Sequence, residues 1–146
     1  PFDDISQEEW DLALNVNLRG PFFASQKAAR AMRKQGSGLI INITDLSAFQ
    51  AWPTYAHHAA SKAGLVSLTK TMASELAPEI RVNAIAPGTV LLPDGSSEDK
   101  RLWAEERSLL KRVGTPQEVA RLVEFLITSE FATGSVYFID GGRALV

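Results

Sequence analysis

A histidine and a lysine stand four residues apart, at His58 and Lys62, within a pattern that predicts a helix over residues 55–76. Side chains at this spacing share one face of a helix. An imidazole exchanges protons near neutral pH, so His58 could act as a proton donor, and the cation of Lys62 would favour the neutral ring. Alternatively, His58 is only a polar helix residue and Lys62 is a solvated surface lysine.

Two further polar residues could join this pair. Asp45 follows a short apolar run, residues 39–43, which predicts a buried strand. A carboxylate beside His58 would favour the charged imidazole, but an aspartate just after a strand is often a turn or cap residue. Asn17 lies close to Gly20 in a predicted helix, where it could bond to a bent backbone. We do not expect His57 and His58 to bind a metal, because adjacent helical residues point ~100° apart.

The elements that must position these residues alternate between helix and strand. Capping boxes at Ser6–Glu9 and Thr115–Glu118 predict two helix starts, and Gly20-Pro21 should kink the first helix. The pattern predicts strands over 39–43, 80–86 and 135–139, and helices over 6–34, 55–76, 98–109 and 116–128. This alternation indicates a single α/β domain over residues 1–146, with a parallel sheet covered on both faces. Three strands are too few to bury these helices, so we expect further strands to complete the sheet.

Composition narrows the classes of function. The chain is 45% hydrophobic and 22% charged, with a formal net charge of −2, so no nucleic acid or anionic membrane is expected as a partner. No apolar run approaches the ~18 residues of a membrane span. The absence of cysteine excludes disulfides and thiolate chemistry. The start at Pro1 lacks the regions of a signal peptide, and a cytoplasmic location is the default expectation.

Four stretches, in order, resemble the landmarks of the short-chain dehydrogenase/reductase family. They are Asn15-Val16-Asn17-Leu18-Arg19-Gly20, Ala60-Ser61-Lys62-Ala63-Gly64-Leu65, Arg81-Val82-Asn83-Ala84-Ile85-Ala86-Pro87-Gly88, and Tyr137-Phe138-Ile139-Asp140-Gly141-Gly142. Asp45 stands where most members have a catalytic serine. With Glu75-Leu76-Ala77-Pro78-Glu79-Ile80 and Thr89-Val90-Leu91-Leu92-Pro93, it makes the chain most similar to bacterial pteridine reductases.

The resemblance implies a Rossmann-type fold and hydride transfer from NADPH to a pterin-like or related carbonyl or imine substrate. It implies that the catalytic residues are Asn17, Asp45, His58 and Lys62. The residues implied to contact the cofactor are Lys62, Pro87, Gly88, Thr89 and Val90. It also implies that residues 89–112 form a substrate lid, and that the helices over 6–34 and 55–76 pair between subunits of a homo-oligomer.

Two departures from the family pattern raise an alternative. None of the ten glycines forms the family's glycine-rich phosphate turn, which belongs upstream of these motifs. The chain is therefore expected to be the C-terminal portion of the fold, without its nucleotide-binding strands. The family's catalytic tyrosine position is occupied by His58, and an imidazole is shorter than a phenol. The alternative is a non-catalytic, oligomerising or binding remnant of such a reductase.

Overall fold

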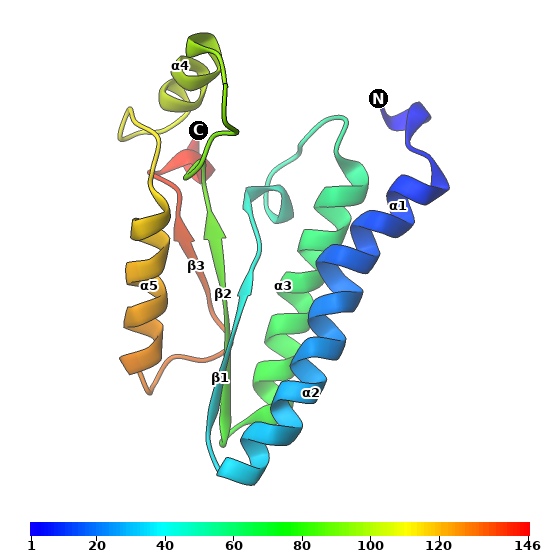
Figure 1. The fold of residues 1–146 in the computed structure, drawn as a ribbon, viewed down its shortest axis with the longest axis vertical. Helices are drawn as coiled ribbons and strands as arrows, with labels where there is room; N and C mark the ends of the chain where they lie inside the picture. The colour runs from blue at the N-terminus through cyan, green and yellow to red at the C-terminus, as the bar shows by residue number, and fades with distance from the viewer.

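The computed structural model describes residues 1–146 and is built on a three-stranded parallel sheet with the order β1-β2-β3 (Figure 1). Helices α2 and α3 lie on one side of this sheet and α5 lies on the other. The predicted parallel α/β architecture is therefore confirmed. The strands are β1 (Gly38–Ile43), β2 (Ile80–Pro87) and β3 (Val136–Ile139).

The helices begin and end close to the predicted positions. They are α1 (Gln7–Leu14), α2 (Gly20–Gln35), α3 (Ala56–Leu76), α4 (Glu98–Glu106) and α5 (Pro116–Thr128). The prediction for α4 is wrong at its end, which comes three residues before residue 109. There the chain turns so that Leu110 N–H and Ser108 Oγ can both donate to the carbonyl of Gly141. None of the helices combines the length and apolar composition that crossing a bilayer requires.

A five-residue π turn, Asn15–Arg19, joins α1 to α2. Pro21 has no N–H to continue the regular ladder, and the N–H of Gly20 bonds instead to the carbonyl of Asn15, five residues earlier. Such a turn adds a residue to the helix and changes the direction of the side chains within it. The predicted interruption at Gly20-Pro21 thus takes the form of a π turn that carries Asn17.

The core lies between β2 and the pair of helices α2 and α3. Val82, Ala84 and Ile85 on β2 are completely buried, as expected for a strand with a neighbour on each side. The core cluster on the side of the sheet that α2 and α3 cover comprises Ala29, Ile40, Met72, Ala73, Leu76, Ile80 and Val82. Apolar burial on this side of the sheet holds α3 in place, and α3 carries both His58 and Lys62.

The small residues of α3 serve a contact within the chain. A side chain at Gly64 would begin 2.9 Å from a methyl carbon of Leu18, which lies in the π turn. The prediction that small residues allow a second helix to approach α3 is correct, but at Gly64 this helix belongs to the same chain. Ala60, four residues earlier, remains exposed.

Two polar residues of β2 hold the loop before β3. The guanidinium of Arg81 donates to the carbonyls of Leu126, Ile127 and Ala132 at 3.0–3.2 Å. Fully buried Asn83 donates to the carbonyl of Ala132 at 2.7 Å and accepts from Ser135 N–H. These bonds satisfy carbonyl groups at the end of α5 and set the entry of β3 into the sheet.

Candidate active site

Three of the four predicted catalytic side chains meet at the carboxyl end of β1. Nε2 of His58, in the first turn of α3, lies 2.7 Å from Oδ2 of Asp45, two residues after β1. Nδ1 of His58 lies 3.5 Å from Nδ2 of Asn17 in the π turn. The side chains of His58 and Asp45 are 31% and 23% exposed, so the pair is accessible without being fully solvated.

Asp45 is both a cap and the partner of His58. Its Oδ1 accepts from Ser47 N–H at 2.9 Å and from the Ser47 hydroxyl, which caps the short 3-10 turn Leu46–Ala48. Partial burial acts to raise the pKa of Asp45, but the hydrogen bonds from Ser47 and His58 together outweigh it and lower the pKa. Asp45 therefore stays a carboxylate at neutral pH. The sequence offered two interpretations of Asp45, as a turn cap and as a neighbour of His58, and the structure shows both contacts.

The direction of the hydrogen bonds around Asn17 indicates which nitrogen of His58 carries the proton. The single hydroxyl hydrogen of Ser61 is donated to the carbonyl of His58 at 2.7 Å. Ser61 must therefore accept from Asn17 Nδ2, 3.1 Å away, and the same amide nitrogen faces Nδ1 of His58. A donor facing Nδ1 favours a ring without a hydrogen at that position. The arrangement thus favours a hydrogen on Nε2 of His58, directed at Asp45.

Lys62 reaches from α3 to β1. Its Nζ donates to the carbonyl of Ile43 at 3.1 Å, while the Thr44 hydroxyl donates to the backbone carbonyl of Lys62 at 3.3 Å. An ammonium group carries three hydrogens, so this contact leaves donors for a ligand. Although Lys62 shares a helix face with His58, its ammonium group forms no hydrogen bond with the imidazole. The structure brings Lys62 to the same end of β1 as the Asp45–His58 pair.

The segment after β2 packs tightly against the end of β3. A side chain at Gly88 would begin 2.7 Å from the Cα of Asp140, so a residue larger than glycine would force the backbone to move. Thr89 Oγ1 accepts from Arg143 at 2.6 Å, and its carbonyl accepts from Gly114 N–H at 2.9 Å. The predicted cofactor segment Pro87–Val90 is thus held by the chain's C-terminal residues. Sequence reasoning missed Arg143; the only signal was a cation one residue after the Asp140-Gly141-Gly142 turn.

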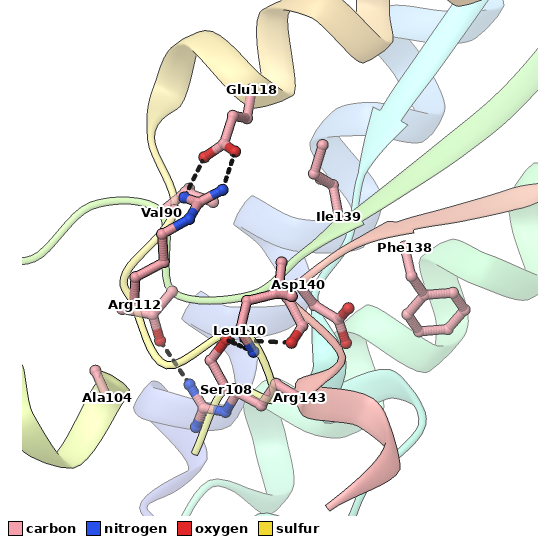
Figure 2. A pocket seen from close by; sticks show the side chains of 13 residues that line it. Val90, Ala104, Ser108, Leu110, Arg112, Glu118, Phe138, Ile139, Asp140 and Arg143 are labelled. Atoms are coloured by element: carbon pink, nitrogen blue, oxygen red, sulfur yellow. Dashed lines mark hydrogen bonds and ion pairs between the residues drawn. The ribbon is translucent and has the colours of Figure 1, made fainter. Parts of the chain in front are cut away.

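A cavity of about 280 Å³ lies beside this segment, between β3 and the start of α5 (Figure 2). Arg112 and Glu118 form a two-point ion pair across it, with the closer contact at 2.6 Å. The hydrogen bonds from Arg112 and from Thr115 N–H lower the pKa of Glu118 to about 2. Glu118 also receives the Thr115 N–H at 2.8 Å at the start of α5, so one carboxylate fixes both the helix and the end of the predicted lid.

The residues present fit the nicotinamide end of a dinucleotide cofactor. Lys62 has free ammonium hydrogens for ribose hydroxyls, and Gly88 brings the backbone close to the end of the sheet without a side chain in the way. Donors for the cofactor's phosphates are a separate requirement, because a glycine-rich turn at a helix start would normally supply them. No such glycine pattern occurs within these 146 residues.

Comparison with known proteins places the chain among reductases and dehydrogenases by sequence. The family model described as enoyl-(acyl carrier protein) reductase matches residues 1–144. The chain is 42% identical to the 3-oxoacyl-(acyl-carrier-protein) reductase FabG of Thermotoga maritima over 97% of the chain and 59% of that protein. It is 37% identical to 3beta-hydroxysteroid dehydrogenase 1 of Eggerthella lenta over 99% of the chain and 59% of that protein. The chain therefore spans about three-fifths of the length of these curated relatives.

Solved structures give the same picture. A gluconate 5-dehydrogenase from Burkholderia cenocepacia J2315, in complex with NADP and tartrate, matches with a TM-score of 0.93 and 32% identity over 100% of this chain and 60% of that one. A 4-hydroxyisoleucine dehydrogenase complexed with NADH and succinate matches with a TM-score of 0.86 and 33% identity, over 100% and 64% of the two chains. None of these four relatives is named a pteridine reductase, so the finer resemblance seen in the sequence has no support from them.

Proposed function

This chain belongs to the short-chain dehydrogenase/reductase family, and we propose that it supplies the catalytic side chains of an NAD(P)-dependent oxidoreductase. In this proposal the Asp45–His58 pair takes the role of the family's catalytic tyrosine. The observation that carries the proposal is the 2.7 Å contact between Nε2 of His58 and Oδ2 of Asp45, at the end of β1 that Lys62 also reaches.

In this mechanism the bound nicotinamide supplies or accepts a hydride, and the chain handles the accompanying proton. Lys62 binds the ribose hydroxyls. With the Nε2 hydrogen directed at Asp45, the nitrogen that exchanges a proton with substrate, directly or through a water, is Nδ1. The Asp45 carboxylate stabilises the imidazolium that forms when Nδ1 is protonated. The long 3.5 Å contact from Asn17 is weak enough to give way to substrate or water.

The substrate proposed is a small carbonyl or imine compound, with the segment over residues 89–112 as a lid. This segment carries α4 and exposes several large apolar side chains that a bound substrate could cover: Leu91, Leu102, Trp103, Leu109 and Leu110. The pterin-like substrate and the preference for NADPH expected from the sequence remain proposals. We would compare dihydrobiopterin and dihydrofolate with a 3-oxoacyl thioester, using NADPH and NADH in turn.

The deciding experiment is calorimetric titration of the protein with NADPH, followed by cofactor-oxidation assays in wild type and Lys62→Ala. Saturable binding, with turnover lost in Lys62→Ala, is the expected result. Lys70→Ala is the matched control, because Lys70 is an exposed lysine two turns further along the same helix. Absence of binding at millimolar cofactor would contradict the proposal and favour the non-catalytic remnant.

We also propose that the protein is a homo-oligomer through α1, α2 and α3. Leu12, Val16 and Phe23 lie on the α1–α2 stretch and are 64%, 62% and 48% exposed, so this stretch presents large apolar side chains that a second subunit could cover. Sedimentation analysis should show an oligomer that Val16→Glu dissociates. Glu8→Gln, an exposed change in the first turn of α1, should leave the sedimentation coefficient unchanged; dissociation by both changes, or by neither, would contradict this interface.

A further inference from the structure

A second hollow, of about 690 Å³, opens between the loop after the Leu46–Ala48 turn, the end of α4 and the C-terminal segment. Gln50 and Trp52 line it from the loop, Arg107 from the position directly after α4, and Arg143 from the turn after β3. Nε2 of Gln50 donates to the carbonyl of Arg143 at 3.2 Å and ties two of these walls together. Its lining residues come from the predicted lid and from the loop that leads into α3, which carries His58.

Two guanidinium groups gather at this hollow around aromatic rings. The guanidinium carbon of Arg107 lies 4.5 Å from the ring centre of Trp103, and that of Arg143 lies 5.2 Å from the same ring. Arg143 is also 5.6 Å from the ring centre of Trp52. The aromatic faces attract both cations and fix their positions, and Thr89 holds one nitrogen of Arg143. The remaining hydrogens of both guanidinium groups stay free to bind a ligand.

Neither guanidinium group at this place forms an ion pair within the chain. The arginine–glutamate pairs of the chain involve Arg101 and Arg112, and the remaining close contact of this kind joins His58 to Asp45. Glu106 also lines the hollow but pairs with neither arginine. Burial and the nearby Arg107 lower the pKa of Arg143, with an opposing effect from Asp140, yet an arginine keeps its charge at any physiological pH. Two cations on one indole ring repel each other, so the arrangement has an energetic cost that a bound anion would offset.

We propose that Arg107 and Arg143 form a subsite for the carboxylate or phosphate group of a ligand, with Trp52 and Trp103 beside its planar or apolar part. Guanidinium groups are suited to two-point binding of both anions. The identification of this ligand as the enzyme's own substrate rests on the proposed function. Anion binding at the subsite does not depend on that function. The substrate class is then an acidic carbonyl compound rather than a neutral one.

The arginine–tryptophan stacking could serve stability or ligand binding, and the two explanations predict different melting temperatures when Arg107 is replaced. If stacking served stability alone, replacing Arg107 should lower the melting temperature. If the site is kept for a ligand, removing one of two repelling cations should leave the melting temperature unchanged or raise it, and should weaken anion binding. Arg107 forms no hydrogen bond through its side chain in the structure, so Arg107→Gln should not disturb the fold.

The test is a titration of tryptophan fluorescence at low, constant ionic strength, first with benzoate and then with inorganic phosphate. Of the three tryptophans, Trp52 lines the hollow and Trp103 stacks on both arginines, so binding should change the signal and saturate. Arg107→Gln and Arg143→Gln should each raise the Kd about tenfold, and Arg143→Lys should raise it less. Arg121→Gln, an exposed change on α5, is the control.

Saturation by phosphate alone would assign the site to a phosphoryl group, and saturation by benzoate would assign it to a carboxylate. A response to neither anion, or a Kd that Arg107→Gln leaves unchanged, would overturn the proposal. If Arg143→Gln loosens the C-terminal turn, Arg107→Gln decides alone. The titration contains no cofactor and should give the same Kd in Lys62→Ala. Anion binding without NADPH binding would therefore sustain the subsite while the proposed activity fails.

Discussion

Nε2 of His58 lies 2.7 Å from Oδ2 of Asp45, and this contact joins the first turn of α3 to the end of β1. The same carboxylate caps the turn that follows β1 through Ser47 N–H. The loop and the imidazole are thus positioned by one residue. The proposed proton exchange at Nδ1 depends on this carboxylate, because it holds the ring and stabilises its charged form.

Replacing Asp45 by asparagine should separate these two functions. Asparagine keeps an oxygen for the Ser47 cap but loses the charge, so activity should fall about 100-fold, as is usual when acid–base catalysis is impaired. The free energy of unfolding should fall by about 1 kcal/mol or less, because the pair is partly exposed. Steady-state assays and urea unfolding measure the two effects. Asp99→Asn in the first turn of α4 is the control, and an unchanged kcat in Asp45→Asn would remove Asp45 from the mechanism.

The state of the His58 ring can be read directly. In wild type we expect nitrogen chemical shifts that place the ring hydrogen on Nε2, because Asn17 directs an N–H at Nδ1. Asn17→Asp replaces this donor by an acceptor, so the variant should carry a hydrogen on Nδ1. Nitrogen-15 NMR of labelled histidine makes the comparison, and His57→Gln identifies which signals belong to His58. A wild-type ring with its hydrogen on Nδ1 would contradict the proposed direction of proton exchange.

The loop before β3 depends on Arg81. Arg81→Met should lower the free energy of unfolding by about 2 kcal/mol, since three carbonyl groups near the end of α5 lose a charged donor. Chemical denaturation followed by circular dichroism is the measurement. Arg121→Met, on the exposed side of α5, should cost a few tenths of a kcal/mol at most. Equal losses in both variants would show that the carbonyl contacts do not matter.

Acid stability should depend on Glu118. Its ordinary pKa of 4.5 falls to about 2 in the folded chain, chiefly through Arg112, so its contribution is present above pH 4.5 and is lost as the pH falls towards 2. Glu118→Gln should flatten the fall of melting temperature across this window, and added salt should weaken the same effect in wild type. Glu124→Gln on the same helix serves as control. If the melting temperature of Glu118→Gln falls with pH as steeply as that of wild type, the Arg112–Glu118 pair does not contribute to acid stability.

Local sequence signals predicted most of the fold. Capping at Ser6–Glu9 and Thr115–Glu118, the apolar runs of β1 and β2, and the breaking residues between them act over a few positions, and a single chain is sufficient to read them. The end of α4 was missed because its cause is remote: Ser108 and Leu110 turn to reach Gly141 across the fold. Likewise, the sequence predicted an interrupted helix at Gly20-Pro21, but it did not predict that the interruption would be a π turn.

The sequence by itself determined the element order, the family and the identity of Asn17, Asp45, His58 and Lys62 as residues of interest, since motif order and helical spacing are linear properties of the chain. Only the tertiary structure decided that Asp45 contacts His58 and that the Asn17 side chain faces the imidazole and not the backbone. It also decided that Leu18 packs against Gly64. It also brought Arg107 and Arg143, which lie far apart in the sequence, to the same ring of Trp103. These are contacts between distant segments, and their distances depend on how the sheet and helices pack.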